Sequence, residues 1–550
     1  MRDGTVLRAD CWRPQRTGRY PVLLMRLPYG KSGAQDWTYA HPWWWASKGY
    51  AVVVQDTRGR YSSDGEFELF VSEGDDSEDT IAWAAEQPFS DGRVGMYGFS
   101  YAGMTQLRGA VHRPEGLAAI APAMTQAEHY EGWAYHHGAF SLAFNASWAT
   151  FLAQNIGRRT HGSSLESELI TQFVSMPSLY GTLPLRAIPY LGRDGPGHFF
   201  QDWLDHETRD YYWDRVDVRD DLGSIDSAAF VVAGLHDIFL EGNLEVFERL
   251  RVGTRGEDAR LVVGPWSHVP WIRAFGELDY GVEAANTVSE TQLRFFDQWL
   301  RDGDPVDGPR ARWFLTGANT WQTSDDWPPP STPWVLHLRS RGRANSLSGL
   351  GYLSEESPDA EAPDVFSYDP AVPVPSRGGR SCCEEGVAPI GPADQRPVEM
   401  MNQVLVYTAP PVDQDRLVVG KIQARLFAAT SARDTDWTVK VCDVHPDGRA
   451  INVQESIQRA RFAAGDGAPR LIPPGEVSEF RFDVGTCSHL FRAGHAIRVE
   501  VSSSNFPQWD RNLNTGNPAG EDTISDRVVA TQYVLHDADH PSSITFPLLG

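Results

Sequence analysis

The first 125 residues alternate apolar runs with amphipathic stretches, and this alternation constrains the fold more than any other feature of the sequence. The segments YPVLLMRLPYG (20–30) and GYAVVVQDTRG (49–59) have the apolar, β-branched character of buried strands that end at turn residues. The acidic start and apolar spacing of EGDDSEDTIAWAAEQPF (73–89) indicate a helix. A further strand and helix follow in GRVGMYGFS (92–100) and YAGMTQLRGAVH (101–112). Strand–helix–strand alternation predicts a mostly parallel sheet covered by helices on both faces.

A different pattern interrupts this sheet and then gives way to it again. Aromatic-rich, mostly helical stretches such as FNASWATFLAQNIGRR (144–159) fill the chain from about 126 to 224. Strand signals return at AAFVVAGLHD (228–237) and ARLVVGPWSH (259–268). We therefore predict one α/β domain made of residues 1–125 plus 225–332. Residues 126–224 would be an inserted helical cap over the carboxyl ends of the strands.

The last part of the chain is β-rich. It follows the proline-rich segment DDWPPPSTP (325–333) and contains many short β-like runs with turn signals between them. Examples are WVLHLRS (334–340), RLVVGKIQARLFAAT (416–430) and AIRVEVSSSN (496–505). Strands of this length and spacing predict an all-β sandwich or jelly roll over residues 333–550.

Charge and cysteine content exclude several classes of partner. A formal net charge of −24 disfavours nucleic acids and anionic membranes, although solubility alone would also explain it. No run of about 18 apolar residues is present, and the N-terminus lacks the apolar core of a secretion signal. The five cysteines are few and odd in number, which favours a reducing cytoplasm. The adjacent pair Cys382 and Cys383 has neither CxxC spacing nor histidines nearby in the sequence, so we expect no zinc or redox site and no metal.

Ser100 lies between glycines in the segment GFSYAG, where a strand gives way to a helix. Because Gly supplies 50 of the 550 residues, the glycine–serine pattern alone is weak evidence for a nucleophile. An ordinary glycine-rich turn would also explain it. The strand–helix setting is more specific. A sharp turn there presents the serine hydroxyl at the edge of the sheet, beside the first N–H groups of the helix. Ser100 is thus a candidate nucleophile.

A serine nucleophile needs a base and a carboxylate that orients the base. In sheet-type hydrolases the chain order is serine, acid, histidine, with each partner after a strand. Asp237 ends one predicted strand and His268 follows the next, so both meet this requirement. His236 is a rival base, but its neighbouring position on the strand would direct it to the opposite side.

Several long motifs resemble the bacterial cocaine esterase and X-Pro dipeptidyl-peptidase family of serine hydrolases, in its esterase branch. They are RLPYGKSG, GYAVVVQDTRGRYSSDGEF, GRVGMYGFSYAGMTQ, GLHDIFLEGNL, GPWSH, DTDWTVKVCDVHPDGRAINV and SSNFPQWDRNLNTG, and together they span nearly the whole chain. The resemblance implies an α/β-hydrolase domain, an inserted helical cap and a C-terminal jelly roll that packs on the hydrolase domain. It also implies no cofactor.

The resemblance further implies roles for individual residues. Ser100, Asp237 and His268 match the nucleophile, acid and base of the family. Its oxyanion hole matches the backbone N–H of Tyr101 and the hydroxyl of Tyr29. Three aromatic residues, Trp133, Trp148 and Phe239, match an acyl pocket; for the two tryptophans, packing of the cap core is the alternative. For Trp43, Trp44 and Trp45 we expect core or interface packing.

These residues predict a serine carboxylesterase that acts on a small-molecule ester with an apolar or aromatic acyl group. Ile238, Phe239 and Leu240 follow Asp237 where α-amino-acid ester hydrolases carry acidic residues, which counts against an α-amino-acyl substrate, although Glu241 leaves an opening. An amidase, dipeptidyl-peptidase or acyltransferase with the same triad is an alternative. A third reading is a carbohydrate-binding module on an inert hydrolase domain. The sequence leaves a homodimer open.

Overall fold

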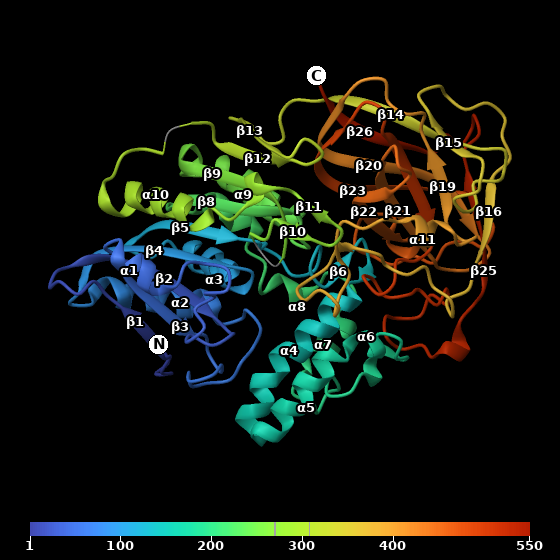
Figure 1. Ribbon diagram of the computed structural model, residues 1–550. Helices are drawn as coiled ribbons and strands as arrows, with labels where there is room; N and C mark the ends of the chain where they lie inside the picture. The colour runs from blue at the N-terminus through green and yellow to red at the C-terminus, as the bar shows by residue number, and fades with distance from the viewer. Residues whose placement is uncertain (269–270, 307) are drawn as a thin grey trace.

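A nine-stranded sheet forms the N-terminal part of the molecule, in the order β1-β3-β2-β4-β5-β8-β9-β12-β13 (Figure 1). The computed structural model describes residues 1–268, 271–306 and 308–550. The pairs from β3 to β12 are parallel, and only the edge strands β1 and β13 are antiparallel to their neighbours. The strands are β1 (Ala9–Trp12), β2 (Tyr20–Leu27), β3 (Ala51–Asp56), β4 (Ser90–Phe99), β5 (Leu117–Ala123), β8 (Ala228–His236), β9 (Ala259–Ser267), β12 (Ala311–Leu315) and β13 (Thr320–Ser324).

Helices cover both faces of this sheet, as strands that are apolar on both sides require. Along β2, Val22 and Leu24 belong to one core, whereas Leu23 and Met25 belong to another. The first core also takes apolar residues of α2 (Glu73–Glu86), α3 (Tyr101–Ala110) and α9 (Leu240–Arg251). The second takes those of α1 (Pro42–Ser47) and α10 (Val288–Arg301).

The tryptophan run in α1 corrects one expectation. Trp45 is fully buried in the second core, but Trp43 is 60% exposed. Both cannot face the sheet, because side chains two positions apart on a helix point to different sides.

The segment between β5 and β8 is mostly helical and projects below the sheet in Figure 1. It contains a short hairpin, β6 (Tyr135–His136) with β7 (Ala139–Phe140). The helices are α4 (Leu142–His161), α5 (Ser163–Val174), α6 (Met176–Leu179), α7 (Phe199–Asp205) and α8 (Tyr211–Asp214). The long helix α4 packs against α5 and α7 and carries Trp148 toward the sheet.

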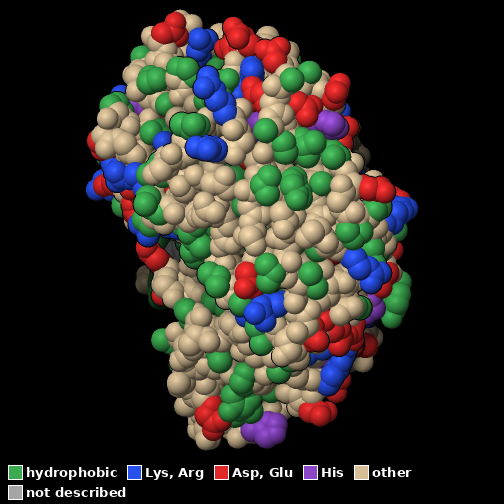
Figure 2. All heavy atoms as spheres, turned by 90° about the vertical axis from the view of Figure 1, so that its right-hand side faces the viewer, with side chains coloured by type: hydrophobic (Ala, Val, Ile, Leu, Met, Phe, Trp, Pro, Cys, Tyr) green, Lys and Arg blue, Asp and Glu red, His purple; other side chains and the backbone are tan. Residues whose placement is uncertain are grey.

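An eleven-stranded β structure forms the C-terminal part, in the order β16-β25-β20-β26-β14-β15-β19-β24-β21-β22, with β23 paired to β20. Its strands are β14 (Thr332–Arg339), β15 (Gly351–Ser354), β16 (Asp364–Tyr368), β19 (Leu405–Thr408), β20 (Arg416–Thr430), β21 (Asp436–Val444), β22 (Ala450–Arg459), β23 (Ser478–Phe491), β24 (Ala496–Ser502), β25 (Ala530–Leu535) and β26 (Ser543–Leu549). Alternate residues of these strands fill a separate core. On the face in Figure 2, acidic and basic side chains are intermixed.

The predicted fold class is confirmed: a mostly parallel α/β sheet with a helical insertion precedes a β-rich jelly-roll domain. Two further pairs of short strands are present: β10 (Ala274–Phe275) with β11 (Leu278–Asp279), and β17 (Gly379–Arg380) with β18 (Ile390–Gly391). A short helix, α11 (Arg396–Glu399), precedes β19. Within the described residues, no helix combines the length and apolar character needed to cross a membrane.

Candidate active site

Ser100 occupies a sharp turn between β4 and α3. Its backbone has φ of 60° and ψ of −126°, a conformation that a residue with a side chain rarely adopts. The Ser100 N–H donates to the Ala123 carbonyl of the neighbouring strand at 2.9 Å, which ties the turn to the sheet. Only 7% of Ser100 is exposed. This strained turn holds the hydroxyl at the carboxyl edge of the sheet.

The two flanking glycines are required by close packing around this turn. Gly98 has φ of +132°, and a Cβ there would approach the Cβ of Ala102 to 2.6 Å. A Cβ on Gly103 would come within 2.7 Å of Thr125. Neither contact leaves room for a side chain, so both positions need glycine.

Three side chains meet at the carboxyl edge of the parallel sheet, after β4, β8 and β9. Asp237 follows β8 and His268 follows β9. The Nε2 atom of His268 lies 3.0 Å from Ser100 Oγ, and its Nδ1 atom lies 2.8 Å from Asp237 Oδ1. All three are buried, with Asp237 at 0% exposure. A buried carboxylate beside Nδ1 favours the tautomer with the proton on Nδ1, which leaves Nε2 free to accept a proton from serine.

Tyr29 and Tyr101 flank the serine with two hydrogen-bond donors. Tyr29 lies just beyond the end of β2, and its hydroxyl accepts a hydrogen bond from Trp148 Nε1 at 3.2 Å. Desolvation by the surrounding protein raises the pKa of the Tyr29 hydroxyl to about 12, although hydrogen bonds with Trp148 and Ser100 act to lower it. The phenol therefore keeps its proton at neutral pH. The Tyr101 N–H begins α3 and has no acceptor within the helix. Both groups can therefore donate to an oxyanion.

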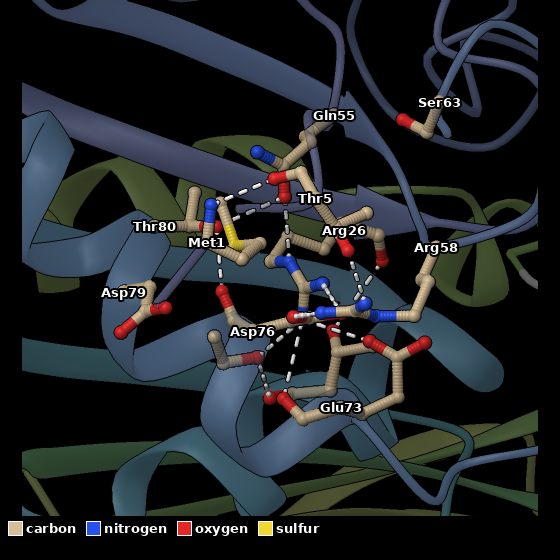
Figure 3. A network of polar contacts seen from close by, with 12 residues as sticks. Met1, Thr5, Arg26, Gln55, Arg58, Ser63, Glu73, Asp76, Asp79 and Thr80 are labelled. Atoms are coloured by element: carbon tan, nitrogen blue, oxygen red, sulfur yellow. Dashed lines mark hydrogen bonds and ion pairs between the residues drawn. The ribbon is translucent and has the colours of Figure 1, made fainter. Parts of the chain in front are cut away.

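The side chain of Tyr101 contacts a buried ionic network. Its hydroxyl donates to Glu73 Oε1 at 2.9 Å. Glu73 Oε2 lies 2.8 Å from Arg26 Nη1, and Arg26 Nε donates to Gln55 at 2.8 Å. Figure 3 shows Arg26 between Glu73 and Gln55, with Arg58 and Asp76 beside them. This network fixes the first residue of α3, and so the position of its N–H.

The predicted pocket residues form one aromatic cluster against His268. The rings of Trp133 and Phe239 lie 4.5 Å apart, those of Trp133 and Trp148 lie 5.0 Å apart, and Phe239 packs edge-on against His268 at 5.1 Å. A residual cavity of about 20 Å³ remains beside Trp133 and Trp148, on the side of Trp203. This is room for about one water molecule, and neither Phe239 nor a triad residue lines the cavity. A bulky acyl group would have to move at least one of these rings.

The cysteine pair lies beside the triad, which the sequence did not suggest. The two sulfur atoms of Cys382 and Cys383 and a ring nitrogen of His268 all lie within 4.8 Å of one another. The two sulfur atoms of the pair are in direct contact. The expectation that this pair forms no zinc or redox site stays a prediction. His268 is distant in sequence but adjacent in space, because the jelly-roll domain brings this loop over the end of β9.

Two other candidates are engaged elsewhere. His236 Nε2 lies 2.7 Å from the Tyr280 hydroxyl, and burial lowers the pKa of His236 to about 3, so it is neutral and directed away from Ser100. Glu241 accepts hydrogen bonds from the Thr486 N–H and hydroxyl at 2.6 and 2.9 Å. It lines a cavity of about 510 Å³ between α9 and the jelly roll that no triad residue lines. Glu241 is thus a domain contact.

Comparison with known proteins gives the same family from two halves of the chain. The sequence model of the X-Pro dipeptidyl-peptidase (S15) family matches residues 3–270. That of the X-Pro dipeptidyl-peptidase C-terminal non-catalytic domain matches residues 306–545. Cocaine esterase of Rhodococcus sp. (strain MB1 Bresler) is 38% identical over 100% of this chain and 97% of its own length.

Solved structures agree over the full length. An aminopeptidase from a marine sediment Thaumarchaeota archaeon has a TM-score of 0.85 and 26% identity, covering 100% of this chain and 95% of its own. An α-amino acid ester hydrolase has a TM-score of 0.81 and 25% identity with the same coverage. With the serine elbow and sheet topology described above, these matches show that the chain belongs to the X-Pro dipeptidyl-peptidase (S15) family of hydrolases that includes cocaine esterase.

Proposed function

We propose that this protein is a serine carboxylesterase in which Ser100 is the nucleophile, His268 the general base and Asp237 the group that orients it. The observation that carries the proposal is the continuous chain of contacts from Asp237 Oδ1 through His268 to Ser100 Oγ, at 2.8 and 3.0 Å, on a strained turn. Such an arrangement activates a hydroxyl that is otherwise a weak nucleophile at neutral pH.

The reaction follows from these positions. Ser100 Oγ attacks the ester carbonyl carbon while its proton passes to His268 Nε2. Negative charge then develops on the carbonyl oxygen, where the Tyr101 N–H and the Tyr29 hydroxyl would donate hydrogen bonds. His268 returns the proton to the alkoxide leaving group, which departs as the alcohol. Water, deprotonated by His268, attacks the acyl-enzyme and releases the acid.

The acyl group would face Trp133, Trp148 and Phe239, which supports an apolar or aromatic acid. Because the rings of Trp133, Trp148 and Phe239 pack with centroids 4.5–5.0 Å apart, small apolar acyl groups would enter with least rearrangement. Trp133→Ala should therefore raise kcat/KM for benzoyl esters relative to acetyl esters with the same leaving group. If the ratio of kcat/KM for benzoyl and acetyl esters were the same in Trp133→Ala as in the wild type, the acyl group would bind elsewhere.

An ester is favoured over an α-amino acid derivative or a dipeptide by the engagement of Glu241. A substrate ammonium needs a carboxylate near the acyl carbon. Glu241 already accepts hydrogen bonds from Thr486 and lies 3.8 Å from Arg380 and 3.9 Å from Lys421. Its carboxylate is therefore engaged with other residues of the protein. The alternative, an amidase or dipeptidyl-peptidase with the same triad, is compatible with the family. An acyltransferase would differ only in its acceptor.

The test compares an aryl ester with its matched anilide and with an Xaa-Pro anilide. We expect the ester to have the highest kcat/KM, and Ser100→Ala to lower kcat by about 10⁶-fold with the fold intact. A fluorophosphonate probe should label Ser100 in the wild type. Faster anilide cleavage would reassign the protein to the peptidase branch, and an unlabelled, fully active Ser100→Ala variant would remove Ser100 from the mechanism.

We also infer a cytoplasmic location and leave a homodimer as the assembly to test. The small number of cysteines motivates the first inference. Cell fractionation tests the location, and light scattering on the purified chain tests the assembly.

A further inference from the structure

Trp37 lies in the segment between β2 and α1, and 63% of this residue is exposed. A tryptophan is usually well buried, and an exposed apolar ring is informative where it borders a functional site. This ring does so, because it packs edge-on against Phe99 with centroids 5.3 Å apart. Phe99 ends β4 and immediately precedes Ser100. Trp37 is therefore one ring away from the serine turn and open to solvent.

The segment that carries Trp37 is fastened to the same strand end. Gln35 is 2% exposed, and its Nε2 atom donates to the Phe99 carbonyl at 3.3 Å, while the Phe99 N–H donates to Gln35 Oε1 at 3.3 Å. The backbone of Gln35 has φ of 51°, a conformation that is uncommon for a residue with a side chain. The same loop contains Tyr29, the proposed oxyanion donor. One strained loop thus holds both Tyr29 and Trp37 beside the nucleophile.

His268 contacts two phenylalanine rings that belong to different cores. Phe239 packs edge-on against it at 5.1 Å and belongs, with Trp133, to the core on one face of the sheet. Phe99 lies 5.7 Å from the His268 ring and belongs to the core on the other face. The acyl group is proposed to face Phe239 and Trp133. The Phe99 side of His268 is therefore left for another part of the substrate.

The chemistry of ester cleavage indicates which part this is. His268 Nε2 gives its proton to the oxygen of the leaving alkoxide, so this oxygen must come within hydrogen-bond distance of Nε2. The carbonyl carbon is bonded to Ser100 Oγ at that moment, and the acyl chain and the alcohol extend from it in different directions. An alcohol that starts at Nε2 and avoids the acyl cluster extends past Phe99 toward Trp37.

We propose that Trp37, with Phe99 beside it, forms the subsite for the alcohol part of the ester, and that this alcohol carries an apolar or aromatic group. The inference rests on the proposed esterase function and extends it to the second half of the substrate. A ring that packs on the indole would cover apolar surface that is otherwise exposed to water, which favours binding. Because the alcohol departs once the acyl-enzyme forms, Trp37 would influence acylation and not hydrolysis of the acyl-enzyme.

The test keeps the acid constant and changes the alcohol. The ratio of kcat/KM for benzyl acetate to that for methyl acetate, measured in a pH-stat, isolates the contribution of the alcohol ring. Trp37→Ala should lower this ratio by about 2–10-fold, and Trp37→Phe should retain most of it. The ratio for methyl benzoate to methyl acetate, which reports the acyl group, should not change in Trp37→Ala. Its deacylation rate constant, measured after a burst with p-nitrophenyl acetate, should also match the wild type.

Trp43→Ala supplies the matched control. Trp43 is 60% exposed on α1, which packs against β1 and β3, so the variant deletes an indole of nearly equal exposure away from β4. It should keep both ratios of the wild type. An alcohol ratio unchanged in Trp37→Ala, or lowered equally in Trp43→Ala, would overturn the inference and leave the proposed function intact. So would a wild-type dimer that Trp37→Ala dissociates without changing the alcohol ratio, because the ring would then cover a second copy.

The outcome for the wild type separates the two proposals. A wild type that cleaves neither acetate ester would contradict the proposed function and this inference with it. A wild type that cleaves both esters upholds the function, and the alcohol ratio of Trp37→Ala then decides the subsite alone. Because the Trp37 side chain is largely exposed, misfolding is an unsuitable explanation for a change in that ratio.

Discussion

The Tyr29 hydroxyl is the single atom whose proposed role is easiest to isolate. It would contribute one donor to the developing oxyanion, and its loss removes no atom of the proposed triad. Tyr29→Phe should lower kcat for an aryl ester by about 10²–10³-fold and change KM little, because the interaction strengthens only in the transition state. Tyr61→Phe removes the hydroxyl of a tyrosine that is 42% exposed and serves as the control. Equal kinetics for the two variants would exclude Tyr29 from the oxyanion hole.

Other residues of the site show what a sequence can and cannot provide at this scale. Ser100, Asp237 and His268 could be proposed because each stands at the end of a recognisable strand, where parallel topology brings side chains together. The positions of Cys382, Cys383 and Glu241 could not. Their surroundings come from contacts between domains, which depend on how two separate cores dock, and no local pattern encodes that docking.

At the scale of elements, the buried network between β2, α2 and α3 supports the serine turn. Arg26 is 0% exposed and binds Glu73, Ser77 and Gln55. Arg26→Met would leave Glu73 buried without its cation and should lower the free energy of unfolding by about 3–5 kcal/mol, measured with urea. Arg2→Met breaks exposed ion pairs with Glu78 and Asp79 and should cost at most about 1 kcal/mol. If Arg26→Met and Arg2→Met lowered the free energy of unfolding equally, burial of the Arg26–Glu73 pair would be unimportant.

Strands β21, β22 and β24, with α11, bury three carboxylates beside two cations. Glu399, Glu455 and Glu500 share their surroundings with Lys440 and Arg498, all at most 8% exposed. Arg498 binds Glu399 at 2.6 Å, and Lys440 lies 3.5 Å from Glu455. Glu500 is the carboxylate in excess. Burial raises its pKa to about 8, with Lys440 opposing and Glu399 adding to the rise.

This raised pKa predicts how stability depends on pH. Below pH ~4.5 Glu500 is protonated in both the folded and unfolded states, whereas between pH ~4.5 and 8 only the folded state holds the proton. Stability should therefore fall as pH rises through this window, by at most about 1.4 kcal/mol per pH unit. Glu500→Gln mimics the protonated form and should remove that slope, measured by urea unfolding from pH 5 to 9. The exposed Glu476→Gln should keep the wild-type slope, and a slope unchanged by Glu500→Gln would contradict the assignment.

For the whole molecule, the order of the domains could be predicted from the sequence, but the contacts between them could not. The parallel sheet, the helical insertion and the β-rich C-terminal part each have their own periodicity in the sequence. The segment around Trp327 shows the limit. Its prolines suggest a linker, yet Trp327 is 1% exposed and packs in the hydrolase core, so the chain is anchored where it passes between domains. Burial by a distant partner leaves no local signature.

These anchored contacts predict that the molecule unfolds as one unit. The Thr316 N–H donates to Ser488 at 3.0 Å and the Leu490 N–H donates to Thr316 at 2.9 Å, so backbone hydrogen bonds join the hydrolase domain to β23. The cap is tied down by Glu207, which binds Arg461 at 3.0 Å and the Ala519 N–H at 2.8 Å.

Calorimetry of the full chain should show a single transition. Unfolding either domain alone would break these contacts and expose apolar side chains such as Val419 and Leu490, which pack in the hydrolase core. Glu207→Ala removes the acceptor shared by Arg461 Nη2 and the Ala519 N–H, and should lower the melting temperature or split the transition. Two well-separated transitions in the wild type would mean that the domains fold independently and that these hydrogen bonds contribute little to cohesion between them.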